Sequence, residues 1–291
     1  YGDHRDLHSF PTRLSSDLAN RKMYVISGGM IMCDLSNMVC MPVMGNAKQH
    51  EVTSIWAYSP VTCMLIENDE GLILFDTGCH PEAMTSRWNE ENRLRTPVTI
   101  GEKEGVLAAL KMLGYQCCDV RYVVLSHLHE DHAGCLEFFS QAQVFVSDRE
   151  LTQTMRSYAL GGDMGGYIKN DITQWLRQGV NWNLVSDEAE EEDLAEGVKI
   201  LNFGSGHTFG MMGLLVTLKE SGNYILASDC VNTGRNYGPP IQFPGLAYDT
   251  IGYKKTVERI HRLEKKYNAK VLFGHDIDQY RTLKFVPEYY S

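Results

Sequence analysis

The chain has 291 residues, a net charge of −10 at neutral pH and 43% hydrophobic residues. This globular composition excludes a disordered chain, and the acidic balance argues against a nucleic-acid-binding surface or an anionic membrane surface. No apolar run approaches the ~20 residues of a bilayer-spanning helix. The eight cysteines are scattered and include no CxxC pair, so we expect a reduced, cytoplasmic protein without a disulfide scaffold or a zinc ribbon.

The beginning of the chain differs from the remainder. Residues 1–19 are polar and aperiodic, and the stretch 8–18 resembles the translation of a common sequencing-library adapter. We therefore expect residues 1–19 to be non-native or a disordered tail that is dispensable for stability and turnover. Residues 20–291 are expected to form one domain.

Apolar spacing predicts the secondary structure. Strands are predicted, in chain order, at 23–27, 62–67, 72–75, 121–126, 144–146, 198–203, 213–218, 224–228 and 270–273. Helices are predicted over 102–113, over most of 150–182 with Asp148 as N-cap, and over 250–267. The Met- and Gly-rich stretch 28–56 is expected to be a long loop with strand pieces, and the acidic run 187–196 a solvated turn or helix end. This order predicts two mixed β-sheets packed face to face, with helices outside.

A histidine- and aspartate-rich motif directly follows the buried strand at 121–126. It reads His127-Leu128-His129-Glu130-Asp131-His132. In an extended segment His127 and His129 point the same way and can reach one metal ion, while Asp131 and His132, after a turn, can face a second. Imidazole and carboxylate together suit zinc and similar ions, so the motif predicts a metal site.

One loop cannot complete two coordination shells, and further candidate ligands follow other strands. They are His207, Asp229 and His275, and with the motif they make a set of seven. The remaining histidines are expected to be structural or surface residues, with His50 and His80 as possible pocket residues.

With these residues the chain resembles the metallo-β-lactamase superfamily. The early strand ending in Asp76-Thr77-Gly78 is similar to the same superfamily. The segments 274–279 and 285–290 resemble its N-acyl-homoserine lactonase branch. The resemblance covers about residues 22–291 and implies an αββα sandwich of two mixed β-sheets flanked by helices.

The resemblance also implies a metal centre with two zinc ions per chain. His127, His129 and His207 would hold one zinc and Asp131, His132 and His275 the other, with Asp229 bridging. Asp76 would orient a ligand from behind, whereas Cys135 and Cys230 are expected to be packed thiols because the ligand sets are complete without them.

The implied activity is hydrolysis of N-acyl-homoserine lactones, which is quorum quenching. A metal-bound hydroxide would open the ring of this small-molecule substrate, and Asp131 would carry a proton to the leaving alkoxide. The chain departs from the lactonase pattern at Asn232, where a tyrosine is usual, and at Glu130, where an apolar residue is common. Asn232 is expected to donate to the substrate oxyanion, with Tyr237 as a substitute phenol.

Other interpretations remain open at this point. The chain could be another hydrolase of the same fold, acting on a different lactone, a thioester or a β-lactam. An iron redox protein or a non-enzymatic zinc-binding module is less favoured. The methionines in the segment 30–44 are expected to line an acyl pocket, with core packing as the alternative. Whether the protein is a monomer or a homodimer is left open.

Overall fold

The computed structural model describes residues 21–162 and 164–291, so the expectation for residues 1–19 lies outside the described residues. Within them the strands form one seven-stranded and one five-stranded sheet. The first sheet has the order β4-β1-β2-β3-β5-β6-β7, and its strands are Lys22–Asp34 (β1), Trp56–Asn68 (β2), Gly71–Phe75 (β3), Val98–Thr99 (β4), Val120–Val124 (β5), Gln143–Ser147 (β6) and Trp182–Val185 (β7). The second has the order β12-β11-β10-β9-β8, and its strands are Glu191–Ala195 (β8), Val198–Gly204 (β9), Met211–Leu218 (β10), Gly222–Ser228 (β11) and Ala269–Phe273 (β12).

Both sheets are mixed. In the first, β1, β2 and β3 are antiparallel, whereas β3, β5, β6 and β7 run parallel. In the second, β8 to β11 are antiparallel and β12 runs parallel to β11. As a result β9, β11 and β12 end at the same edge of their sheet, which is where parallel strands place functional loops.

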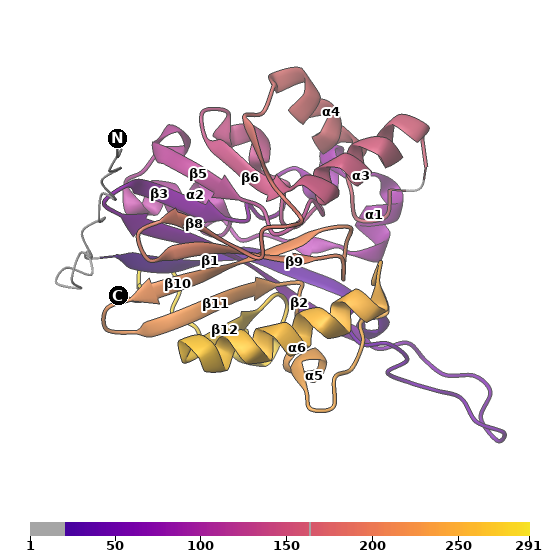
Figure 1. The fold of residues 1–291 in the computed structure, drawn as a ribbon. Helices are drawn as coiled ribbons and strands as arrows, with labels where there is room; N and C mark the ends of the chain where they lie inside the picture. Colours follow the sequence, from indigo (N-terminus) through magenta and orange to yellow (C-terminus); the bar gives the residue numbers. More distant parts are fainter. Residues whose placement is uncertain (1–20, 163) are drawn as a thin grey trace, which may run out of the picture.

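Helices cover the two outer faces. They are Glu90–Arg95 (α1), Val106–Leu113 (α2), Asp148–Leu160 (α3), Lys169–Gln178 (α4), Gly234–Tyr237 (α5), Thr250–Tyr267 (α6) and Ile277–Tyr280 (α7). In Figure 1 α3 and α4 lie over the side of β5 and β6, whereas α6 lies along β11 and β12 on the opposite side. Short helical turns occur at Leu35–Asn37, Ala83–Arg87, Cys117–Asp119 and Leu136–Phe139.

Buried apolar layers between and outside the two sheets hold these elements together. Between the sheets, side chains such as Ile66, Phe75 and Leu214 are almost completely buried. A second layer joins the first sheet to α2 and α4, and a third joins the second sheet to α6. The layering confirms the predicted αββα sandwich.

Two local predictions were wrong. The acidic run 187–196 contains β8, because pairing with β9 satisfies its backbone while its acidic side chains remain at the edge of the sheet. The N-cap of α3 is Ser147, whose hydroxyl accepts from the Glu150 N–H, and Asp148 is the first helical residue. The helix predicted at 250–267 has the same bounds in the structure.

The connection between β1 and β2 projects from the sandwich as an arm (Figure 1). β1 continues to Asp34, beyond the predicted strand, and the arm follows the turn at Leu35–Asn37. None of the helices in the described part of the chain combines the length and the apolar character needed to cross a bilayer.

Candidate active site

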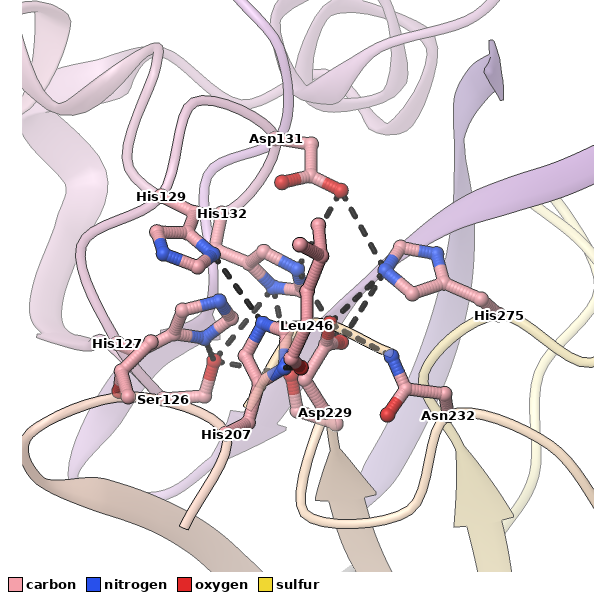
Figure 2. Close-up of polar contacts among 12 residues, drawn as sticks. Ser126, His127, His129, Asp131, His132, His207, Asp229, Asn232, Leu246 and His275 are labelled. Carbon is pink, nitrogen blue, oxygen red and sulfur yellow. Dashed lines mark hydrogen bonds and ion pairs between the residues drawn. The ribbon is translucent and has the colours of Figure 1, made fainter. Parts of the chain in front are cut away.

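The seven predicted ligands meet where the two sheets face each other. The loop after β5 carries His127, His129, Asp131 and His132, and this loop belongs to the first sheet. The second sheet supplies three more from the ends of its strands: His207 after β9, Asp229 after β11 and His275 after β12 (Figure 2).

The side chains form three overlapping groups in which the potential ligand atoms lie within 4.8 Å of one another. Two groups match the expected zinc sets, and the third contains Asp229 with a member of each. The groups are His127–His129–His207, Asp131–His132–His275 and His127–His132–Asp229. Asp229 therefore lies between the two sets, as a bridging ligand must.

Hydrogen bonds to the outer ring nitrogens orient three of the imidazoles. Nδ1 of His132 lies 2.8 Å from Asp76 Oδ2, Nδ1 of His207 lies 3.2 Å from the Leu246 carbonyl, and Nδ1 of His275 lies 3.0 Å from the Pro60 carbonyl. Because all three partners accept, each Nδ1 carries a proton and each Nε2 faces the centre.

Asp76 holds the start of the histidine-rich loop in place through hydrogen bonds to Ser126. Its Oδ1 accepts from the Ser126 N–H at 2.7 Å, and its Oδ2 accepts from the hydroxyls of Ser126 at 2.8 Å and Ser228 at 3.3 Å. Asp76 and Ser228 both have left-handed backbones, with φ of 58° and 47°. Non-glycine residues adopt this conformation only when surrounding contacts hold them there, and such strain concentrates at functional sites.

Only glycine fits immediately before His275. A Cβ at Gly274 would overlap Asp229 Oδ1 and the backbone of Ser228. A side chain at this position would therefore displace the aspartate that joins the two histidine groups.

The pKa values of the histidine and aspartate side chains in the centre are shifted in different directions. Burial lowers the pKa of His127 and His129, whose rings are therefore neutral. Burial also opposes ionisation of Asp131, but the neighbouring rings of His132 and His275 outweigh it and hold its pKa at about 2. For His275 burial is in turn outweighed by Asp229 and Asp131, which raise its pKa to about 9. A cation entering the centre would have to displace this proton.

The donor set fits a divalent cation. His127 Nε2, His132 Nε2 and Asp229 Oδ1 are buried and have no hydrogen-bond partner. Asp229 Oδ1 lies 3.3 Å from His132 Nε2 and 3.1 Å from His275 Nε2, so these atoms are in ion pairs with one another. A divalent cation at the centre would satisfy all three buried atoms. Imidazole nitrogens and carboxylate oxygens without thiolate match borderline and hard metal ions. Cys135 and Cys230 are buried free thiols and belong to none of the three groups.

A cavity of about 260 Å³ opens onto this centre. His129, Asp131, His207, Asp229 and His275 contribute to its wall. The rest of the wall is largely apolar, with polar residues on one side, and includes Ile31, Met38, Arg95, Thr96, Glu130, Met164, Tyr167 and Leu246.

The two predicted substrate-contacting residues have different positions. Asn232 lines the cavity, its Nδ2 donates to Asp229 Oδ2 at 3.2 Å, and its Oδ1 accepts from the Tyr253 hydroxyl at 3.4 Å (Figure 2). Tyr237 is not brought to the site. Its hydroxyl donates to Glu264 of α6 at 2.7 Å and its ring contacts that of His261 at a tilted angle, so it does not face the centre as a substitute phenol.

The expectation for the Met-rich segment holds only at Met38. That residue lines the cavity, whereas Met41 and Met44 lie on the projecting arm and are 66% and 69% exposed. The other wall positions in this region are Ile31, Cys33 and Asn37, on β1 and the turn that follows it.

The sequence did not reveal the role of Glu150. This buried residue of α3 accepts from the Leu128 N–H at 3.1 Å and from the Gly210 N–H at 3.0 Å, so it joins the loop of the motif to the loop of His207. The Tyr167 hydroxyl, at 3.0 Å, is a third donor. Glu150 follows Ser147 at the spacing of a helix capping box, and that pattern indicates a local role only.

The fold and the composite histidine–aspartate centre define a metallohydrolase-like α/β sandwich. The family model of the metallo-β-lactamase superfamily matches residues 57–275, and the chain belongs to this superfamily. The centre is accordingly a candidate site for divalent metal.

The chain is similar to curated and structurally characterised lactonases. The N-acyl homoserine lactonase AiiB of Agrobacterium fabrum is 38% identical over 264 residues, covering 90% of this chain and 96% of the relative. A mutant of AiiA from Bacillus thuringiensis, solved with N-decanoyl-L-homoserine bound at the active site, is 26% identical with a TM-score of 0.76 and covers 92% of this chain. An N-acyl homoserine lactone hydrolase, solved with the product N-hexanoyl-L-homoserine bound at its catalytic metal centre, is also 26% identical, with a TM-score of 0.76 and coverage of 92% of this chain. In both comparisons 98% of the solved chain is covered.

Proposed function

We propose that the protein hydrolyses the lactone ring of N-acyl-homoserine lactones and thereby acts in quorum quenching. The observation that carries the proposal is the convergence of seven histidine and aspartate side chains, five of which line a largely apolar cavity. Similarity to lactonases over nine-tenths of the chain supports the same substrate class. In this proposal residues 20–291 form the hydrolase domain.

We propose two zinc ions as the cofactors. His127, His129 and His207 would hold one ion and Asp131, His132 and His275 the other, with Asp229 shared between them. Two bound ions would supply an activated water at neutral pH and would polarise the lactone carbonyl.

Asp131 is the residue proposed to move the proton. It lines the cavity, and its Oδ2 lies 3.4 Å from His275 Nε2 and 3.5 Å from His132 Nε2. With its pKa held at about 2, Asp131 is ionised at neutral pH and can accept a hydrogen bond from the attacking water. In this proposal the carboxylate carries the proton only transiently, as the water attacks. Delivery of that proton to the alkoxide oxygen, as the ring C–O bond breaks, completes the hydrolysis.

Asn232 is proposed to bind the substrate oxygen. The Tyr253 hydroxyl holds the amide oxygen, so the amide nitrogen is directed toward the centre and Asp229. One N–H is used on Asp229, and the second can donate to the substrate carbonyl as negative charge develops there. An amide cannot supply a proton, so proton transfer falls to Asp131.

A substrate panel on zinc-loaded protein tests the proposal. The panel contains N-hexanoyl- and N-decanoyl-homoserine lactone, a simple γ-lactone, a glutathione thioester and a β-lactam. Homoserine lactones should have the highest kcat/KM, and elemental analysis should find close to two zinc ions per chain. Preferred turnover of the thioester or the β-lactam would replace the lactonase assignment with that activity.

The variant His129→Ala tests whether this histidine is a metal ligand. Because the same side chain contributes to metal binding and to the cavity wall, metal content and turnover should fall together. Retention of both would show that His129 is not a ligand.

A further inference from the structure

His129 differs from the other four histidines of the centre in how its ring is held. Those four direct Nε2 toward the centre, and Nδ1 has a partner: Ser126 Oγ for His127, Asp76 for His132, the Leu246 carbonyl for His207 and the Pro60 carbonyl for His275. The His129 ring is reversed, because its Nδ1 lies toward the centre, 3.2 Å from His207 Nε2 (Figure 2). Within the described part of the chain no hydrogen bond holds its Nε2, and His129 is only partly buried, whereas the other four are buried.

A ring without such a hydrogen bond is free to turn over. The torsion about the Cβ–Cγ bond of histidine is broad and roughly two-fold. A half-turn exchanges Nδ1 with the ring carbon Cδ2, so in His129 it would place a carbon where the ligand nitrogen now lies. The orientation of this ring therefore depends on the groups that pack against it.

Two consecutive residues, Gly166 and Tyr167, pack against the His129 ring. The Tyr167 ring contacts it edge-on, with the ring centroids 4.7 Å apart and an interplanar angle of 74°. A Cβ at Gly166 would approach the same ring to 2.9 Å, so the Gly166 backbone already lies against it. The Gly166 carbonyl accepts from the Glu130 N–H at 2.9 Å, which holds this segment beside the histidine-rich loop.

Tyr167 is itself held from two sides. Its hydroxyl donates at 3.0 Å to Glu150 Oε1, the oxygen that also accepts from the Leu128 N–H at 3.1 Å. Its ring stacks on that of Phe209, with centroids 5.8 Å apart and an interplanar angle of 18°. Since Leu128 directly precedes His129, one carboxyl oxygen fixes both the loop and the tyrosine that packs on it.

We propose that Tyr167 is a positioning residue for His129, whose ring it keeps turned with Nδ1 toward the centre. This inference rests on the proposed function, because it concerns the zinc ion assigned to His129, and it deepens that proposal. Tyr167 acts through His129 and not on the substrate, since its hydroxyl is used on Glu150. Without the tyrosine ring, His129 would turn over in part of the molecules, and one zinc ion would lose a ligand there.

Zinc affinity tests the inference without any substrate. Competition with a chromophoric chelator compares the wild type with Tyr167→Leu and Tyr167→Phe. In Tyr167→Leu the affinity for one ion should fall about tenfold or more, as for the loss of a partner that orients a ligand. Tyr167→Phe keeps the ring and should retain most of the affinity. A loss in Tyr167→Phe as large as in Tyr167→Leu would show that the bond to Glu150 matters and the ring contact does not, and would overturn the inference.

Nitrogen NMR of the imidazole rings reports the orientation of the ring itself. In the zinc-loaded wild type, one histidine should bind zinc through Nδ1 and the others through Nε2. The Nδ1-bound signal should be missing in His129→Ala, persist in Tyr167→Phe and weaken or disappear in Tyr167→Leu. A full Nδ1-bound signal in Tyr167→Leu would overturn the inference.

Tyr158→Leu is the matched control. Tyr158 lies in α3, is also partly buried and has its hydroxyl 2.9 Å from Thr173 Oγ1, but it does not line the cavity. The substitution should lower the melting temperature and leave the zinc affinity at the wild-type value. An equal loss of zinc affinity in Tyr158→Leu would assign the effect to general destabilisation and would overturn the inference.

Gly166→Ala keeps the test valid if Tyr167→Leu does not fold, because it displaces the same ring without removing any side chain. Its Cβ would lie 2.9 Å from the His129 ring and 2.8 Å from Glu130 Oε2, so both the zinc affinity and the Nδ1-bound signal should fall. In the control Gly162→Ala the added Cβ would meet nothing closer than the Ser157 carbonyl oxygen at 3.9 Å, and both readouts should stay at wild-type values. Wild-type affinity in Gly166→Ala would overturn the inference.

The readouts use zinc alone, so they separate this inference from the lactonase activity. Unchanged zinc affinity in Tyr167→Leu, with normal lactone turnover by the wild type, would overturn the inference and leave the proposed function standing. Absence of lactone turnover, with zinc affinities that change as expected, would instead overturn the lactonase proposal. A wild type that binds no zinc would overturn both.

Discussion

The contact between Asp76 and His132 allows a test of how the protein prepares its metal centre. In Asp76→Asn the shape of the side chain is retained, and asparagine tolerates the left-handed backbone found here. The amide oxygen can still accept from the Ser126 N–H, but the amide nitrogen now faces His132 Nδ1 in place of a carboxylate oxygen. Two donors would then oppose each other.

The imidazole can relieve this conflict only by changing tautomer. If Nδ1 of His132 becomes the acceptor, the proton moves to Nε2, which is the buried nitrogen left without a hydrogen-bond partner at the centre. Metal binding must then first reverse this change. Loss of a partner that orients a ligand typically costs ~10–100-fold in metal affinity, which corresponds to about 1.4–2.7 kcal/mol.

Competition with a chromophoric chelator measures this affinity directly. Asp171→Asn is the control, because Asp171 is also a buried aspartate but pairs with Arg87 away from the centre. Its zinc affinity should equal that of the wild type even where its stability falls. Zinc affinity within twofold of wild type in Asp76→Asn would refute the tautomer argument.

Three further predictions concern stability and the residues around the site. Burial raises the pKa of Glu150 from 4.5 to about 7 in the folded protein. The protonated side chain therefore contributes its full stabilisation below the pKa of the unfolded chain, and this contribution is lost as the pH rises through the pKa of the folded protein. In metal-free protein the free energy of unfolding should therefore fall by up to about 3 kcal/mol between pH 4.5 and pH 8, and urea titrations of Glu150→Gln should show a clearly smaller fall; equal slopes would contradict this. Tyr237→Phe should leave kcat unchanged and cost ~1 kcal/mol of stability through the lost bond to Glu264, whereas a tenfold fall in kcat would return Tyr237 to the site. Leu65→Ala, at a completely buried position of β2, should cost ~2–5 kcal/mol in denaturant titrations, and a cost below 1 kcal/mol would show that the neighbouring layers collapse into the space.

Local patterns predicted the parts of the fold that depend on nearby residues. The apolar spacing of α6 and the dense motif after β5 each lie within one segment, so the chain itself shows them. The convergence of His207, Asp229 and His275 was predictable because each directly follows an apolar strand, and parallel strands end at one edge of a sheet.

Features that depend on distant partners were missed or wrongly assigned. The strand β8 exists because β9 pairs with it, although its acidic composition is typical of a solvated turn. Glu150 matches a helix cap in sequence, but its carboxylate extends to two loops more than twenty residues before and sixty residues after it. Tyr237 is near Asn232 in sequence, yet its hydroxyl donates to Glu264 of α6 and not to a group in the centre.

The division of the candidate ligands between the two sheets has a consequence for folding. Each of the three ligand groups combines residues of the first sheet's loop with a residue supplied by the second sheet. Neither sheet alone can present a complete group, so an ion cannot be captured tightly until the two sheets have docked. Binding that is confined to the docked state stabilises that state by mass action and opposes separation of the sheets. The rate of zinc uptake during refolding would thus time the closure of the sandwich, which secondary-structure signals from the individual sheets do not reveal.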